Sequence, residues 1–200
     1  MLPSPPSLAA TPVKLDIQRK TLRDFRRIVP AHHSATPLGF DRTAPSRFSD
    51  PRTPANFGVV YLGQTLKVCF VEAILRDHAV GQPGPYPMVE SEITGRAVTV
   101  VGSTSPLLLV NLRGDGLVRM RLPTDMAKAA DHALGRWYSV LLHDHPDKPD
   151  GLIYDSRING GISVAIYERA LSKLMASSPH ALVADAALAS ILDRYAVALV

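Results

Sequence analysis

The hydrophobic pattern is clearest over residues 57–77, where an apolar run leads into a helical repeat. Residues 57–62 are mostly apolar and end at Gly63, which predicts a buried strand. Thr65 is placed to cap a following helix. Apolar side chains then recur on one helical face, at Leu66, Cys69, Phe70, Ala73 and Ile74. Most of the remaining helix surface is apolar too, which predicts a largely buried helix.

One carboxylate, Glu72, stands in the middle of this predicted helix. A buried carboxylate is costly unless it is paired or used. A structural interpretation pairs it with Arg76, four residues later and in the favoured order of acid before base. A functional interpretation makes it a site carboxylate, since perturbed or buried charges gather at functional sites. The local sequence allows both.

Elsewhere the pattern predicts strands and helices interspersed along the chain. Strands are predicted over residues 25–29, 88–93, 97–101, 107–112, 151–155, 162–167 and 195–200. Helices are predicted over residues 14–24, from Thr124 onward, over 132–143 and over 185–194. The order lacks a strict strand–helix–strand rhythm, so we expect an α+β (mixed α/β) domain with partly antiparallel sheets.

The domain organisation follows from composition. Residues 1–12 are rich in Pro, Ser and Ala and predict a disordered leader, with a single domain over residues 13–200. Residues 31–56 predict a long loop, and loops of that length are usually functional or disordered. This loop carries three cationic side chains suited to phosphates, Arg42, Arg47 and Arg52.

Apolar runs, charge and cysteine content indicate where the protein is located and what kind of ligand it binds. No apolar run reaches the roughly 18 residues of a membrane span, and the start of the chain lacks a basic and apolar signal, so we expect a cytoplasmic protein. Cys69 is the only cysteine, which excludes an intramolecular disulfide. The net charge of +4 suits an anionic ligand. The basic residues are scattered without a nucleic-acid-binding motif, so no direct nucleic-acid binding is expected.

Other short motifs give little indication of function. There is no glycine-rich phosphate fingerprint and no Gly-x-Ser-x-Gly elbow. The histidine pairs at 32–33 and 143–145 lack the three or four convergent ligands of a zinc site, so no metal is expected. Trp137 is typical of a core residue, and Ser156 alone is typical of a turn.

Taken together and in order, several short segments resemble the RES domain, the toxin component of a bacterial toxin–antitoxin family. The segments that carry the resemblance are residues 25–28, 46–51, 57–63 and 70–76, Trp137 and residues 150–157. They cover about residues 25–170. Arg26 stands where many relatives have an aromatic side chain, so the family arginine is Arg27 or its neighbour Arg26.

The resemblance implies a fold like that of the ADP-ribosyltransferases, with split sheets and flanking helices around an NAD cleft. It implies a growth-arresting toxin that cleaves NAD, as substrate, at the nicotinamide–ribose bond. The catalytic residues would be Glu72, Arg27 and Ser156. The residues that contact NAD would be Arg27, Arg47, Tyr61 and Ser156. Water, phosphate and a protein side chain are all open as the acceptor.

Chemistry is consistent with this resemblance. Breaking the bond to nicotinamide builds positive charge on the ribose, which a rigid carboxylate such as Glu72 stabilises. The family also implies a cognate antitoxin of the Xre (helix-turn-helix) type that covers the active site, and a homodimer or hetero-oligomer. The competing hypothesis is a non-catalytic binding module of the same fold that binds a protein partner or nucleic acid.

Overall fold

The computed structural model describes residues 14–77 and 84–200. The predicted leader, residues 1–12, lies outside the described residues. The strands are β1 (Ile17–Lys20), β2 (Phe25–Pro30), β3 (Val59–Gly63), β4 (Tyr86–Met88), β5 (Arg96–Ser103), β6 (Leu107–Asn111), β7 (Gly151–Asp155), β8 (Ile162–Tyr167), β9 (Leu174–Ala176), β10 (His180–Ala181) and β11 (Val197–Leu199).

Short helices separate these strands. The α-helices are α1 (Leu66–Ala73), α2 (Ser91–Thr94), α3 (Gly116–Arg119), α4 (Asp125–Lys128), α5 (Ala133–His143) and α6 (Leu188–Arg194). Short 3-10 helices lie at η1 (Ala31–His33), η2 (Leu75–Asp77), η3 (Glu168–Lys173) and η4 (Leu182–Ala184). Over the described ranges, no helix combines the length and the apolar character that crossing a membrane requires.

Within the described residues, nine strands form one sheet in the order β1-β6-β7-β8-β3-β2-β5-β10, with β9 also paired to β5. β4 and β11 form a separate two-stranded parallel sheet. In the large sheet, β6 and β7 pair parallel and the other neighbours pair antiparallel. This mixed architecture confirms the predicted fold class.

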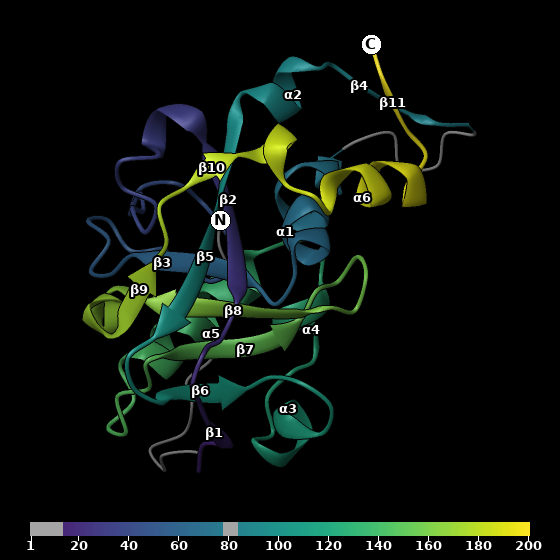
Figure 1. Cartoon of the computed structure of the whole chain (residues 1–200). Coiled ribbons are helices and arrows are strands. Elements are labelled where there is room, and N and C mark those ends of the chain that lie inside the picture. The colour runs from purple at the N-terminus through teal and green to yellow at the C-terminus, as the bar shows by residue number, and fades with distance from the viewer. Residues whose placement is uncertain (1–13, 78–83) are drawn as a thin grey trace.

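The large sheet is divided at the contact between β2 and β3. These two strands share a single register pair, Arg26 with Gly63, whereas β2 pairs with β5 along its whole length. Figure 1 shows β2 and β5 running steeply across the direction of β3, β8, β7 and β6. The sheet thus has two halves, as expected for split sheets, and we call their contact the seam.

Helix α1 lies beside the seam, packed against both β2 and β3. The hydroxyl of Thr65 accepts a hydrogen bond from the N–H of Val68 at 3.3 Å, so the predicted N-cap is confirmed. The buried face of α1 includes Leu66, Phe70 and Val71. Because this apolar surface anchors the helix, its polar side chains are held in defined positions.

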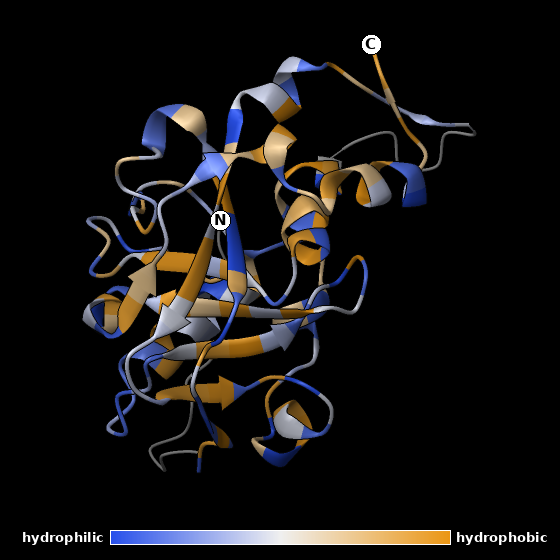
Figure 2. Cartoon of the chain, in the orientation of Figure 1, coloured by the Kyte–Doolittle hydropathy of each residue, from blue (hydrophilic) through white to orange (hydrophobic). Residues whose placement is uncertain are grey.

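Alternation along the strands produces a different core on each face of the sheet. Val60, Ile153 and Val164 belong to one buried cluster, while Tyr154 and Ala165 belong to another that includes residues of α5. A third cluster lies under α1 and α6. Figure 2 shows the apolar character of the central strands. Tyr61 packs against the α5 cluster, so β3 and β7 direct their tyrosines to the same side.

Two predicted elements were wrong. Residues 14–24, predicted as a helix, contain β1, which pairs with β6 along Ile17–Lys20. This pairing satisfies the backbone of an otherwise open sheet edge, and it outweighs a weak helical pattern. The predicted strand over 88–93 ends at Met88, and Ser91–Thr94 form α2 instead. Residues 31–56 are largely irregular, as predicted, apart from η1.

Candidate functional site

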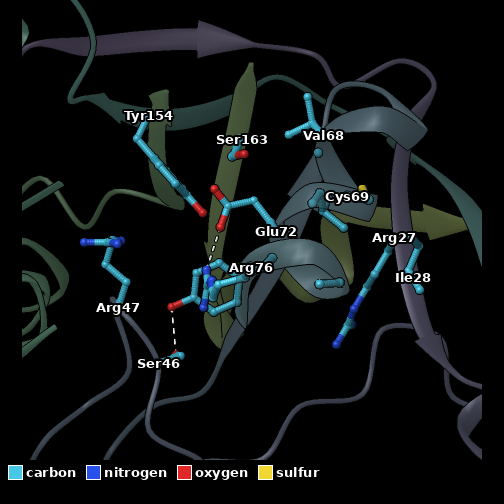
Figure 3. Close-up of a pocket in the computed structure, with 14 residues that line it drawn as sticks. Arg27, Ile28, Ser46, Arg47, Val68, Cys69, Glu72, Arg76, Tyr154 and Ser163 are labelled. Carbon is cyan, nitrogen blue, oxygen red and sulfur yellow. Dashed lines mark hydrogen bonds and ion pairs between the residues drawn. The ribbon is translucent and has the colours of Figure 1, made fainter. Parts of the chain in front are cut away.

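A cavity of about 240 Å³ lies at the seam. Its walls come from β2, β3, α1, β7 and β8, together with the segment around Arg47 in the long loop. Figure 3 shows Tyr154, Ser163 and Arg76 around the side chain of Glu72, with the guanidinium groups of Arg27 and Arg47 further from it. The cavity therefore combines residues from both halves of the sheet, and polar groups share its walls with the apolar Ile28, Leu62 and Val68.

Glu72 holds two hydrogen bonds at the wall of this cavity. Its Oε1 accepts from the hydroxyl of Ser156 at 2.5 Å, and its Oε2 accepts from Nη2 of Arg76 at 2.6 Å. The side chain is 20% exposed. The ion pair of the structural interpretation is thus present, and so is the placement that the functional interpretation requires. The pairing holds the carboxylate in one orientation without removing it from the cavity.

Ser156 follows the end of β7 and is buried. Its hydroxyl donates to Glu72 and accepts the N–H groups of Ile158 at 3.2 Å and Asn159 at 3.4 Å. Ser156 is therefore a turn residue, as its local sequence indicates, and also the partner of Glu72. It is not among the residues that line the cavity, and it meets the cavity through the carboxylate.

Arg47 lines the cavity and is only 7% exposed. Its Nη1 donates to the carbonyl oxygen of Ala129 at 2.6 Å. Burial is the main cause that lowers the pKa of Arg47, while the nearby Tyr154 and Glu72 act to raise it. The guanidinium therefore lies within electrostatic range of the carboxylate, as a largely desolvated cation.

Tyr61 orders the loop segment that carries Arg47. Its hydroxyl accepts the N–H of Phe48 at 2.8 Å and lies 2.8 Å from the hydroxyl of Ser46. Burial raises the pKa of Tyr61, so the hydroxyl stays protonated. Tyr61 also lines the cavity. A side chain from a rigid strand thus sets the position of a residue in an irregular loop.

Arg27 lines the cavity from β2, and its guanidinium binds the long loop. It donates to the carbonyl oxygens of Pro37 at 2.9 Å and Gly39 at 2.7 Å. Burial lowers its pKa to about 10. Its neighbour Arg26 donates to the carbonyl of Asp24 and does not line the cavity. Of the two arginines that the sequence left open, Arg27 is the one at the site.

Cys69 also lines the cavity from α1. Its thiol donates to the carbonyl oxygen of Arg26 at 2.9 Å. Burial raises its pKa to about 12, so it is neutral at physiological pH. A neutral, buried thiol is a poor nucleophile, and Cys69 acts here as a packing residue.

Sequence reasoning missed Tyr154 and Ser163, which line the cavity from β7 and β8. One signal was available for Tyr154. It stands two residues before Ser156, and side chains two apart in a strand share a face. Ser163 had no such signal, because its place depends on the register of β8, which pairs it with both Tyr154 and Gly63.

The arrangement presents one carboxylate among three guanidinium groups. Arg27, Arg47 and Arg76 all line the cavity with Glu72. Such a balance favours an anionic ligand, and guanidinium groups bind phosphates with directed hydrogen bonds. Across residues 14–77 and 84–200, no group of three or more His, Cys, Asp or Glu is arranged to hold a metal ion.

Comparisons with known proteins place this geometry in context. The model of the RES domain family matches residues 24–187, which include every candidate site residue. A curated relative, "Probable toxin y4kH" of Sinorhizobium fredii (strain NBRC 101917 / NGR234), is 47% identical over 104 residues, covering 52% of this chain and 82% of the relative. A chain in the crystal structure of the M. tuberculosis MbcT–MbcA toxin–antitoxin complex has a similar fold, with a TM-score of 0.59 at 15% identity, over 82% of this chain and 85% of that chain.

Proposed function

The chain belongs to the RES domain family, and from that premise we propose that it is the toxin of a bacterial toxin–antitoxin system and cleaves NAD between nicotinamide and ribose. The toxin assignment is supported by the relative that is named a probable toxin and by the fold shared with a chain of a toxin–antitoxin complex. The assignment of NAD is supported by the chemistry of the cavity.

The observation that carries the proposal is the placement of Glu72. Its carboxylate is held between Ser156 and Arg76 on a buried helix, at the wall of a cavity lined by further cations. Cleavage breaks the bond between ribose C1′ and the ring nitrogen, and the electron pair leaves with neutral nicotinamide. The ribose becomes positively charged, and a preorganised carboxylate stabilises that charge. The acceptor then bonds to C1′ and loses its proton.

The cations suit the remaining part of NAD. A guanidinium can pair with pyrophosphate oxygens through two parallel hydrogen bonds. Arg47 fits this role better than Arg27, because Arg27 donates through both terminal nitrogens to loop carbonyls, whereas Arg47 donates through Nη1 alone and lies within electrostatic range of Glu72. At about 240 Å³, the cavity is slightly smaller than the roughly 300–1,000 Å³ of typical ligand pockets. It would take the nicotinamide riboside half, with Tyr61 against the ring.

Ser156 is then a positioning residue for Glu72. Its hydroxyl is already donated to the carboxylate, and the same oxygen accepts two backbone N–H groups of the turn. Because no histidine is paired with Ser156 among the described residues, the arrangement does not favour Ser156 as a nucleophile. The acceptor in this proposal is water, phosphate or a protein side chain.

The proposed partner is a cognate antitoxin of the Xre type that covers the cavity, in a hetero-oligomer within the cytoplasm. The shared fold with a chain from a toxin–antitoxin complex supports an antitoxin partner. Covering the cavity would block access to the one carboxylate among its lining residues.

The test is release of nicotinamide from NAD by the purified protein, with and without phosphate. We expect release by the parent protein and its loss in Glu72→Gln. The matched control is Glu168→Gln, which removes a carboxylate paired with Arg42 and the N–H of Gly58, away from the cavity. Folded parent protein that releases no nicotinamide under any condition, including with candidate protein acceptors, would support the non-catalytic binding module instead.

A further inference from the structure

Two hydroxyl groups at the cavity have no hydrogen-bond partner among the residues that the structure describes. Tyr154 is 6% exposed and Ser163 is 3% exposed, and both line the cavity. Neither side chain makes a hydrogen bond within the described residues. The oxygens of both hydroxyls keep some exposure, since neither is among the fully buried side-chain atoms without a hydrogen bond. Both residues line a cavity that is large enough for part of a ligand, so these hydroxyls are available to one.

The two side chains are held rigidly and close together. Tyr154 and Ser163 are direct partners in the antiparallel register of β7 and β8, so they point to the same face of the sheet. The ring of Tyr154 packs edge-on against Phe48, with ring centroids 5.1 Å apart. Figure 3 shows the side chain of Tyr154 directed toward the carboxylate of Glu72, with Ser163 on the neighbouring strand beside them.

Both hydroxyls are neutral groups beside charged ones. Burial is the main cause that raises the pKa of Tyr154 well above its usual value, and the negative charge of Glu72 raises it further. The phenol therefore keeps its proton and can donate a hydrogen bond as well as accept one. The Ser163 hydroxyl has the same two capacities.

The hydrogen-bonding capacity of each polar group in the cavity indicates which part of the proposed substrate it can bind. The ionised carboxylate of Glu72 can only accept hydrogen bonds, so it suits the donating hydroxyls of ribose. Nicotinamide carries a primary carboxamide, whose oxygen requires a donor and whose NH₂ group requires an acceptor. The guanidinium groups only donate and suit the pyrophosphate. Neutral hydroxyls are the groups at this cavity that can serve both ends of an amide.

We infer that Tyr154 and Ser163 form the subsite that binds the carboxamide of nicotinamide and so places the reacting bond against Glu72. This inference rests on the proposed function and names the part of the substrate that these residues recognise. It predicts that the cavity selects a pyridine ring that carries an amide over the same ring without one.

The test compares two probes, nicotinamide and 3-methylpyridine, at a pH where both rings are neutral. Affinities for the parent protein, Tyr154→Phe and Ser163→Ala are measured by NMR titration. The same comparison is made on kcat/KM with NAD and with its analogue that carries 3-methylpyridine. The matched control is Tyr167→Phe, which removes a buried phenol hydroxyl that is bonded to Ser139 outside the cavity.

We expect each site variant to lower the preference for the amide by about two- to tenfold, the worth of one neutral hydrogen bond. Affinity for 3-methylpyridine should not change, and Tyr167→Phe should keep the preference of the parent. A preference that is the same in the parent and both site variants would overturn the inference.

The two proposals fail in different ways. If the parent releases nicotinamide from NAD but the variants keep its amide preference, the subsite is wrong and the proposed function stands. If the parent selects nicotinamide through Tyr154 and Ser163 but cleaves no NAD, the subsite stands and the function is wrong. A parent that neither binds nicotinamide nor cleaves NAD overturns both.

Discussion

Replacing Glu72 with glutamine removes one negative charge while keeping nearly the same shape. The carboxylate accepts from Ser156 and Arg76 through different oxygens, so the single amide oxygen of glutamine can keep only one acceptor position. The variant therefore tests the charge that the proposed reaction requires and perturbs the packing of α1 very little.

The two expected effects differ in size. Loss of one preorganised electrostatic group lowers the catalytic rate by on the order of 10²–10³. For stability, the Ser156 hydrogen bond loses its ionic character, which costs about 1 kcal/mol. In the ion pair, the side chain of Arg76 is 35% exposed and that of Glu72 is 20% exposed. Solvent screening therefore limits the contribution of the pair to stability to about 0–1 kcal/mol. The free energy of unfolding should fall by about 1–2 kcal/mol.

Both effects can be measured on the same samples. Nicotinamide release gives the rate, and urea unfolding followed by circular dichroism gives the free energy of unfolding. Arg76→Ala separates the interpretations, because a purely structural ion pair predicts equal damage to stability from either side and no specific loss of turnover. The reasoning is refuted if folded Glu72→Gln releases nicotinamide within a few-fold of the parent rate.

Three further predictions concern the surroundings of the site. Arg27→Ala should lower the free energy of unfolding by about 2–3 kcal/mol, because two loop carbonyls lose a charged donor; urea titration measures this, and an unchanged midpoint would contradict it. Burial acts to raise the pKa of Asp50, but hydrogen bonds from Arg52 and from backbone N–H groups hold it below its usual value. The ionised Asp50 therefore stabilises the fold above the unfolded-state pKa of about 3.9. This contribution is lost as the pH falls through the lower pKa of the folded state. The free energy of unfolding of Asp50→Asn should therefore fall less steeply in acid than that of the parent. Cys69, with its pKa raised to about 12 by burial, should react with a thiol reagent only after unfolding in urea; rapid labelling of the native protein would show that the thiol is accessible.

Local patterns were enough to predict the centre of the fold. The strand before Gly63, the capping by Thr65 and the buried face of α1 all depend on neighbouring residues, and the structure confirms them. β1 could not be predicted in this way, because its pairing partner is β6, far along the chain. Such an edge strand is stabilised by the sheet more than by its own sequence.

The site residues likewise divide into those that a local pattern indicates and those whose position depends on distant parts of the chain. Glu72 was noticeable from the sequence because a carboxylate interrupts an apolar helix. Its two partners differ in range, since Arg76 lies one helical turn away and Ser156 reaches it from the end of β7. Ser163 could not be predicted at all, because a one-residue slip of β8 would point it to the opposite face.

The strand pairings at the seam determine when the cavity can form during synthesis and folding of the chain. Val59–Gly63, the strand that leads into α1, pairs almost entirely with β8, which is made far later in the chain. A growing chain that has passed Glu72 but not yet reached Ser163 lacks the opposite wall and cannot form the cavity. Long-range pairings of this kind also close slowly, because the intervening chain must be ordered first. Whatever this cavity binds or cleaves, the protein acquires that ability only after β8 has been synthesised and paired.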